Sequence, residues 1–326
     1  MDYVSNDDND IPFVQHNNLE NILEFREFLE YAGYELDPLP EGLPDEEPLI
    51  LPPPRPQAAA PQIPGWIQWL EQPEQADNVL TLAYKGKDKE LKEKLSGAEP
   101  ASPHAMITPG DRSAVYLAAM NGHAKCITIL KEKGANVCYP DENGFAPLHV
   151  ASQSGHLAAV KALIKAMPPQ NVMQFNKGQM LPIHMAALGG HLDIIDHLVK
   201  SGSKVNVVDV DNETPLYYAA KANQAGALEY FARAGVDVDA CNKSDMTPLW
   251  IASVCGCSAA VAKLHSLDAD CTKAPTKAEP PIFNGMTPLQ AAEQAGRAPT
   301  VALLKKLDAL KIEMETAKEA YSVANK

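Results

Sequence analysis

Thr214-Pro-Leu-Tyr-Tyr-Ala-Ala220 is one of six related segments in this chain of 326 residues. The other five are Ser113–Ala119, Ala146–Ser152, Leu181–Ala187, Thr247–Ser253 and Thr287–Glu293. Their second residues stand at positions 114, 147, 182, 215, 248 and 288, so the intervals between them are 33, 35, 33, 33 and 40 residues. A nearly constant spacing predicts an array of structural units, each packed on its neighbours.

Each unit is predicted to contain two helices. Thr-Pro is typical of a helix start, because the Thr hydroxyl caps free amides and Pro loses no hydrogen bond at the first position. A glycine such as Gly155 makes the tight turn into the second helix. That helix carries aliphatic side chains at helical spacing, as in Ile194, Ile195 and Leu198, and a second glycine such as Gly202 ends it.

These segments resemble the ankyrin repeat over residues 77–310, with about seven units. The resemblance implies an all-α fold, an ankyrin-repeat α-solenoid. The first unit, near residues 78–95, lacks the proline and is rich in Lys and Glu, as expected of a capping repeat with a polar outer face. Extra residues within Ala166–Gly178 and Cys271–Phe283 are predicted to project from one face, as local candidates for partner contact. Residues 311–326 are expected to form a C-terminal helical extension that caps the stack.

Residues 1–76 form a different region, an extended, acidic, Pro-rich N-terminal arm. Residues 19–33 have the pattern of an amphipathic helix, which either packs on the repeats or docks on a partner. The Pro-rich stretch Pro52–Pro56 predicts polyproline II, either as a stiff spacer or as a ligand for a proline-recognition domain. Trp66 and Trp69 either seal the first repeat or anchor a partner.

The acidic excess of the chain also lies in this arm. Residues 1–76 contain 16 Asp and Glu but only two basic residues, which leaves 26 acidic and 26 basic residues for the remainder. Because an acidic arm repels phosphates and a neutral body does not attract them, nucleic-acid binding is disfavoured. The sequence has no run of about 18 apolar residues, so membrane insertion is not expected.

Cysteine usage and the first residues favour an intracellular setting. The six cysteines are too sparse for a disulfide framework. The segment that begins at Met1 lacks the basic and apolar regions of a secretory signal. We therefore expect a cytoplasmic protein, with a nuclear location left open.

The histidines recur with the repeat, which argues against catalysis. A catalytic site needs one asymmetric group of side chains, whereas these residues occupy only two repeat positions. The resemblance implies that they bond loop backbone. They are His123, His149, His156, His184 and His191.

Four cysteines together with His265 suggest zinc as an alternative to simple burial: Cys241, Cys255, Cys257 and Cys271. Structural zinc sites use ligand pairs that a turn brings together, and Cys255-Gly-Cys257 is a poor pair. We therefore expect these cysteines to be small buried residues, with no metal and no cofactor. The sequence also lacks phosphate-loop, nucleophile-elbow and His-Glu-x-x-His motifs, so a non-enzymatic protein is expected.

The resemblance also implies a binding surface formed by the turn tips and the inner helices. The residue two before each proline is expected to point from the tip toward a partner, and four of the five are large and apolar: Phe145, Met180, Glu213, Met246 and Met286. Neighbouring tip residues extend this expected ridge: Tyr139, Glu142, Asn143, Val208, Val210, Lys243 and Phe283. Inner-helix positions such as Leu188 and Lys221 complete it.

The predicted function is therefore a protein–protein interaction scaffold or adaptor. One alternative is a regulatory protein, either an inhibitor or a transcriptional cofactor, that acts through the acidic arm. Another is a structural subunit of a larger assembly. The sequence does not identify the partner, because repeat arrays bind many unrelated targets.

Overall fold

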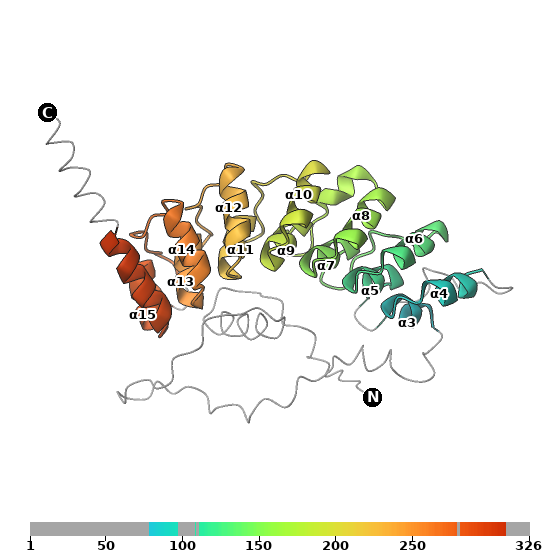
Figure 1. The fold of residues 1–326 in the computed structure, drawn as a ribbon, viewed down its shortest axis with the longest axis horizontal. Coiled ribbons are helices and arrows are strands. Elements are labelled where there is room, and N and C mark those ends of the chain that lie inside the picture. The colour runs from blue at the N-terminus through green and yellow to red at the C-terminus, as the bar shows by residue number, and fades with distance from the viewer. Residues whose placement is uncertain (1–77, 97–107, 109–110, 279–280, 311–326) are drawn as a thin grey trace, which may run out of the picture. The chain divides into compact units, whose positions relative to one another are not determined.

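The computed structural model describes residues 78–96, 108, 111–278 and 281–310 (Figure 1). The predicted arm helix, the Pro-rich stretch, Trp66, Trp69 and the extension 311–326 lie outside these residues. The described residues divide into two compact units, with the break between Lys177 and Gly178. This break falls at the end of the insertion that interrupts the repeat spacing.

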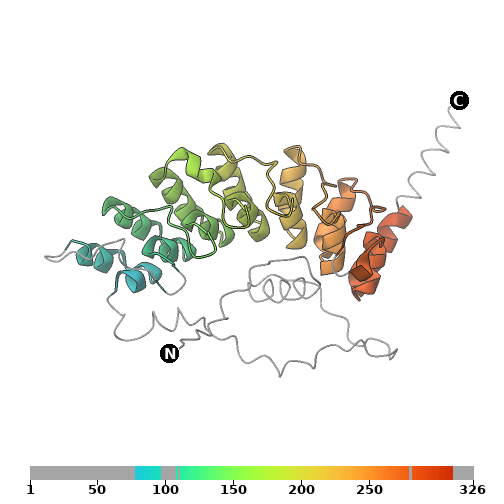
Figure 2. The same ribbon diagram turned by 180° about the vertical axis from the view of Figure 1, so that it is seen from behind.

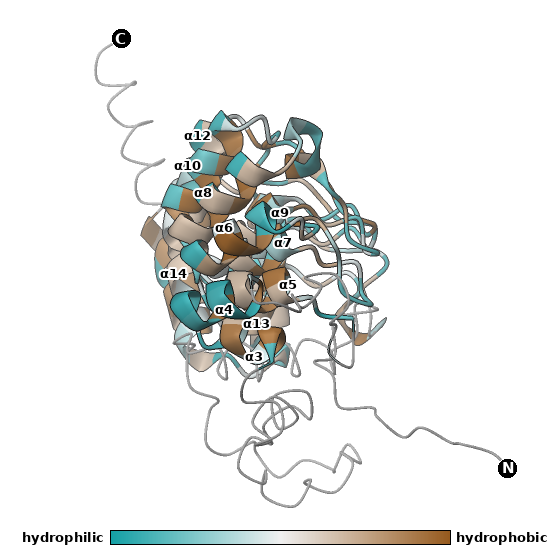
Figure 3. Ribbon diagram, turned by 90° about the vertical axis from the view of Figure 1, so that its right-hand side faces the viewer, coloured by the Kyte–Doolittle hydropathy of each residue, from teal (hydrophilic) through white to brown (hydrophobic). Residues whose placement is uncertain are grey.

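The first unit consists of helix pairs. Its helices are α3 (Val79–Tyr84), α4 (Asp88–Lys94), α5 (Ala114–Met120), α6 (Ala124–Glu132), α7 (Pro147–Gln153) and α8 (Leu157–Ala166), followed by the 3-10 helix η2 (Pro169–Met173). The first helices of the pairs pack in series, α3 on α5 and α5 on α7, and the second helices form a parallel row of α4, α6 and α8. Figure 3 shows α4 as largely hydrophilic and α5 as largely hydrophobic, as the capping-repeat prediction requires.

The second unit repeats this arrangement. Its helices are α9 (Pro182–Gly189), α10 (Leu192–Lys200), α11 (Pro215–Lys221), α12 (Ala225–Arg233), α13 (Pro248–Cys255), α14 (Ser258–Ser266), the 3-10 helix η3 (Pro281–Phe283) and α15 (Pro288–Gln294). Residues 298–310 are also helical. Helices α9, α11, α13 and α15 pack in one row, and α10, α12 and α14 in a second, as Figures 1 and 2 show from opposite sides.

The core confirms the predicted helical periodicity. Ile194, Ile195 and Leu198 on α10 are fully buried, and so is the small pair Ala219 and Ala220 on α11. Small side chains on the first helices allow close approach, while aliphatic side chains fill the space between the rows. All regular secondary structure in the described ranges is helical, which confirms the predicted all-α repeat fold. None of these helices is long and apolar enough to cross a membrane.

The helix starts also form as predicted. Thr214 Oγ1 accepts the N–H of Tyr217 at 3.1 Å, and Thr247 Oγ1 accepts that of Trp250 at 3.1 Å. Where the cap residue has no hydroxyl, a histidine replaces it: His184 Nδ1 accepts the N–H of Leu181 at 3.0 Å. Either way, an amide at the start of a helix is satisfied.

Replacing Thr214 with alanine is therefore expected to lower the free energy of unfolding of the second unit by about 1 kcal/mol, because the Tyr217 amide loses its acceptor. Thr214→Ser keeps the hydroxyl and should lie within a few tenths of a kcal/mol of the wild type. Urea unfolding followed by circular dichroism measures both. Equal losses in the two variants would show that the methyl group, and not the cap, carries the effect.

Candidate protein-binding surface

Four of the turns that connect successive repeats are built around one buried Asp or Asn. These four anchor residues, spaced 35, 33 and 33 apart, are Asp141, Asn176, Asp209 and Asn242, and all are at least nine-tenths buried. In the first unit, Asp141 Oδ1 accepts the N–H of Asn143 at 3.0 Å and of Phe145 at 2.8 Å. Its Oδ2 accepts the hydroxyl of Tyr116 at 3.1 Å. Asp141 therefore holds this turn through its side chain.

Asp209 has the same role in the second unit. Its Oδ1 accepts the N–H of Asp211 at 2.9 Å and of Glu213 at 2.8 Å. Its Oδ2 accepts the hydroxyl of Tyr218 at 2.7 Å. Because the carboxylate holds two amides and one hydroxyl, the conformation of the turn is set from the inside.

The residues beside an anchor face outward, since neighbours in an extended segment alternate in direction. Val208 and Val210 flank Asp209 and are 42% and 41% exposed. Phe175 stands before Asn176, at the repeat position of Val208, and is 54% exposed. Tyr139, near the Asp141 turn, is 38% exposed. The fold does not require apolar side chains here, so these four residues, which we call the tip residues, are candidate protein-binding positions, two in each compact unit.

Phe175 is not among the residues predicted at the turn tips, although the sequence contains a signal for it. Aligning Asn176 with Asp209 places Phe175 in register with Val208. The insertion Ala166–Gly178 hid this alignment because it shifts the spacing by two residues. Its 3-10 helix η2 absorbs the extra length and leaves Phe175 exposed.

The prediction of an exposed ridge is wrong at seven of its fourteen positions. Five residues expected at the turn tips are buried: Phe145 at 6%, Met180 at 6%, Glu213 at 4%, Met246 at 1% and Phe283 at 2% exposed. Two residues expected on the inner-helix surface are buried as well: Leu188 at 2% and Lys221 at 5% exposed. Met286 and Asn143 are half-buried. The remaining predicted ridge residues are exposed, as expected: Tyr139, Glu142, Val208, Val210 and Lys243. Partner contact by any of them stays a prediction.

The anchor residues explain why these predicted surface residues are buried. The residue four after an anchor donates its N–H to the anchor, as Met246 does to Asn242 Oδ1 at 3.0 Å, and this bond turns its side chain into the helix layer. There Phe145 packs edge-on against the His149 ring, and Met180 Sδ lies 3.2 Å from the Tyr218 hydroxyl. The insertion Cys271–Phe283 does not project from the fold at its last residue, because the Phe283 ring packs edge-on against Trp250.

Glu213 is the most unusual of these buried residues. Asn242 Nδ2 donates to its Oε1 at 3.1 Å and also lies 3.3 Å from the Tyr217 hydroxyl. Burial raises the pKa of Glu213 to about 7, although the Lys221 ammonium opposes the rise. A protonated carboxyl can donate as well as accept hydrogen bonds, which suits a site with little water.

The histidines bond to backbone, as the resemblance implied. His149 Nδ1 accepts the N–H of Ala146 at 3.1 Å, in the same way as His184 at its own helix start. His123 Nε2 donates to the carbonyl of Tyr84 at 3.0 Å. Burial lowers the pKa of His184 to about 4, so this ring is neutral at physiological pH. These groups hold turns and helix starts in place.

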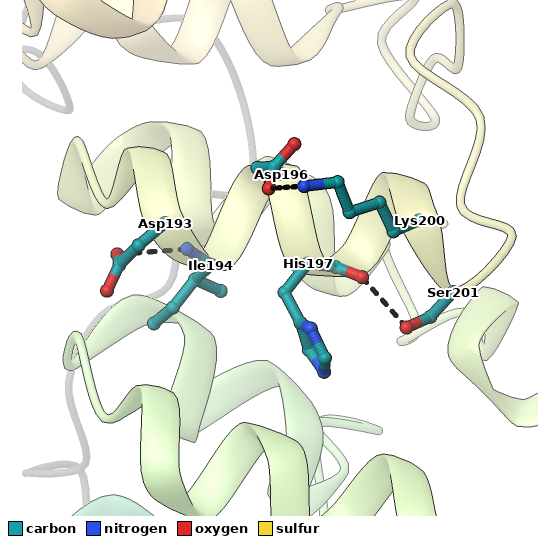
Figure 4. Close-up of polar contacts among 6 residues, drawn as sticks. All are labelled: Asp193, Ile194, Asp196, His197, Lys200 and Ser201. Carbon is teal, nitrogen blue, oxygen red and sulfur yellow. Dashed lines mark hydrogen bonds and ion pairs between the residues drawn. The ribbon is translucent and has the colours of Figure 1, made fainter.

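Several polar side chains on or just after α10 bond to neighbouring residues of the same segment (Figure 4). Lys200 Nζ lies 2.5 Å from Asp196 Oδ2, and Ser201 Oγ donates to the His197 carbonyl at 2.8 Å. Exposed i,i+4 pairs of this kind contribute only a few tenths of a kcal/mol, roughly, to stability. We therefore interpret this face as a solvated helix surface.

The cysteines separate into two groups. Cys255 and Cys257 are buried, and the Cys257 thiol donates to the Lys221 carbonyl at 3.5 Å, so their predicted burial is confirmed. Cys241 and Cys271 are half-buried. Cys271 lies near His265 and Asp308, with one potential ligand atom from each residue within 4.8 Å of the others.

Comparison with known proteins supports the repeat assignment. A family model described as "Ankyrin repeats (3 copies)" matches residues 79–175 and 183–275, together more than half of the chain. Among solved structures, the human ASB11 ankyrin repeat domain is similar, with a TM-score of 0.55 and 22% identity over 67% of this chain and 95% of that domain.

Similarity to curated proteins is local. The chain is 39% identical over 62 residues to dynein axonemal heavy chain 12 of Bos taurus, covering 19% of this chain and 17% of that protein. It is 33% identical over 60 residues to protein phosphatase 1 regulatory subunit 27 of Homo sapiens, covering 18% and 39%. The chain thus matches well under half of either relative. The family match and the paired helices agree, and the chain belongs to the ankyrin repeat family.

Proposed function

We propose that this protein is a non-enzymatic scaffold or adaptor that binds a partner protein through its exposed turn tips. The observation that carries the proposal is the outward, apolar side chains of Val208 and Val210 on either side of Asp209. The buried carboxylate already holds the turn, so the two valines contribute nothing to its geometry that a polar residue would not. Apolar side chains in such a place favour contact with another protein.

The physical basis of binding is a preformed surface. Because Asp209 holds the turn through three hydrogen bonds, little conformational entropy is lost when a partner docks. Burial of the two valines then contributes about 25 cal/mol for each Å² of apolar surface removed from water. In the first unit, Phe175 and Tyr139 offer the same kind of surface at their own turns.

The absence of catalysis is part of the proposal. The repeated polar groups, such as His149, His184 and Asp209, bond to their own chain and so serve the fold. The ankyrin repeat fold implies protein–protein interaction, and one relative is named as a regulatory subunit, which supports an adaptor or regulatory role. A cytoplasmic location is part of the proposal, because the six cysteines of the sequence are too sparse for a disulfide framework.

The double variant Val208→Asp, Val210→Asp is expected to reduce partner capture at least about tenfold, since two charges would be desolvated at the contact. Affinity capture from native lysate with quantitative mass spectrometry measures this against the wild type. Leu192→Asp is the matched control, because Leu192 is 42% exposed but lies on α10 and not on a turn. Equal losses in the control and the double variant would refute binding at the turn tips.

The acidic arm gives the alternative a separate readout. If Pro52–Pro56 binds a proline-recognition domain, or if the arm regulates a partner, deletion of residues 1–76 removes capture while the tip variant retains it. If the repeats bind, the deletion retains the partner that the wild type captures. The same capture experiment therefore distinguishes the two proposals.

A further inference from the structure

Three metal-ligating side chains meet at the C-terminal part of the second unit. His265 lies near the end of α14, Cys271 lies in the following turn, and Asp308 lies on the helix formed by residues 298–310. One nitrogen, sulfur or oxygen atom from each lies within 4.8 Å of the other two. The three residues come from different segments, and the fold alone brings them together.

One ring nitrogen of His265, in this cluster, has no hydrogen-bond partner among the described residues. This atom, Nε2, is buried. The nearest carboxylate oxygen, Asp308 Oδ1, is 3.9 Å away, too far for a hydrogen bond. A buried ring nitrogen without a partner is costly, so the arrangement needs something between the two groups.

We propose that His265, Cys271 and Asp308 bind a divalent transition-metal ion, with zinc as the best chemical fit. Zinc accepts imidazole nitrogen, thiolate sulfur and carboxylate oxygen together, whereas magnesium and calcium prefer oxygen alone. Three protein ligands leave a fourth tetrahedral position for a water molecule. All three ligands are partly buried, which limits competition from bulk water.

The three ligand atoms, which lie within 4.8 Å of one another, must move closer by roughly an ångström at most to fit a tetrahedral ion. Bonds of about 2.0–2.3 Å from zinc place neighbouring ligand atoms about 3.3–3.6 Å apart. The observed 3.9 Å between His265 Nε2 and Asp308 Oδ1 is a few tenths of an ångström wider. Asp308 is 38% exposed, so its side chain has room to close this gap.

Metal binding releases one proton, from the Cys271 thiol. In the absence of metal, the Cys271 thiol points toward the Ala269 carbonyl, with the sulfur 3.6 Å from the oxygen. On binding, the S–H bond breaks, the sulfur lone pair forms the bond to the metal, and the proton leaves to solvent. The ion would then link α14, the turn after it and the helix at 298–310, and so hold the last repeat to its neighbour.

Cobalt(II) titration of the full-length reduced protein tests the proposal, because a thiolate bound to cobalt has a charge-transfer absorption band. We expect one equivalent of cobalt to produce this band and one equivalent of zinc to remove it. Cys271→Ser should abolish the band, and His265→Gln and Asp308→Asn should each weaken zinc affinity at least about tenfold. Asp308→Asn alters a partly exposed group, so it also controls for misfolding.

Cys241→Ser is the matched control, because Cys241 is another half-buried thiol of the second unit outside the cluster. It should keep both the cobalt band and the zinc affinity. No band in the wild type, a band that survives Cys271→Ser, or a band lost equally in Cys241→Ser would each overturn the site. Retention of the band in the double valine variant would show that the metal site and the tip residues are independent.

Discussion

Replacement of Trp250 with alanine is expected to lower the free energy of unfolding of the second unit by about 3–5 kcal/mol. Trp250 is 1% exposed on α13 and is among the largest fully buried side chains of the described residues. Its Nε1–H donates to the Met286 carbonyl at 3.0 Å, and its ring packs edge-on against Phe283 at 5.7 Å. The substitution therefore opens a cavity and also leaves the Met286 carbonyl without its donor.

Trp250 also connects repeats across the longest interval. Met286 and Phe283 belong to the segment with the 40-residue spacing, so the indole holds the insertion against α13. Hydrogen exchange of amides in α13 and α15, together with urea unfolding followed by circular dichroism, measures the loss. Exchange should speed up in α15 as well as in α13, because the two helices pack together.

Two variants bracket the Trp250 prediction. Trp250→Phe keeps most of the apolar volume but loses the N–H donor, so its loss should be clearly smaller than that of alanine. Leu192→Ala removes an apolar side chain that is 42% exposed and should change stability by no more than about 0.5 kcal/mol. If Trp250→Ala behaved like Leu192→Ala, the packing of the insertion on α13 would be wrong.

The free energy of unfolding of the second unit is expected to depend on pH through two buried groups, Glu213 and His184, with opposite signs. The pKa of Glu213 is raised from 4.5 to about 7 by burial, whereas the pKa of His184 is lowered from 6.5 to about 4, also by burial. Both shifts favour the neutral form in the folded state. One group is an acid and the other a base, so their contributions to stability have opposite signs along the pH axis.

For Glu213, the carboxyl is protonated in both states below pH 4.5. Between pH 4.5 and 7 the unfolded chain loses its proton while the folded chain keeps it, so stability falls as pH rises. For His184, the ring is neutral in both states above pH 6.5. Between pH 6.5 and 4 only the unfolded chain gains a proton, so stability falls as pH falls. Each shift corresponds to roughly 3 kcal/mol.

The two contributions therefore largely cancel between pH 4.5 and 6.5 in the wild type. Glu213→Gln removes one of them, so the variant should gain stability relative to the wild type as pH rises from 4.5 to 7, by roughly 3 kcal/mol in total. His184→Gln should gain relative stability as pH falls from 6.5 to 4. Glutamine can replace His184, because Gln290 occupies the same repeat position at the start of α15 and its Oε1 accepts the N–H of Thr287 at 2.9 Å.

Urea unfolding at a series of pH values, compared with the wild type at each pH, isolates these terms from all other titrating groups. The difference also removes any constant loss from weaker contacts with Asn242 or Lys221. Leu192→Ala, which removes an exposed side chain of α10 that does not titrate, should give a difference that does not vary with pH. A flat difference for Glu213→Gln would show that its carboxyl is ionised in the fold at acidic pH.

Local chemistry explains why so much of the fold could be predicted from the sequence. The spacing of Thr-Pro segments locates the first helices, and the cap at Thr214 depends on residues only three apart. Ile194, Ile195 and Leu198 reveal the buried face of α10 by periodicity alone. The histidine bonds follow from repeat position. The two insertions were visible as changes in interval, although their conformations were not.

The tertiary structure decided what the sequence left open, namely the direction in which side chains point once the turns have closed. Phe145 and Met246 were expected on the surface, but their N–H groups bond to Asp141 and Asn242 and their side chains turn inward. Phe175, which was not expected there, faces outward beside Asn176. The cluster of His265, Cys271 and Asp308 joins residues up to 43 positions apart, which no local pattern encodes. The repeat is determined by interactions within a few residues, whereas surface, buried charge and ligand geometry depend on the packing of distant segments.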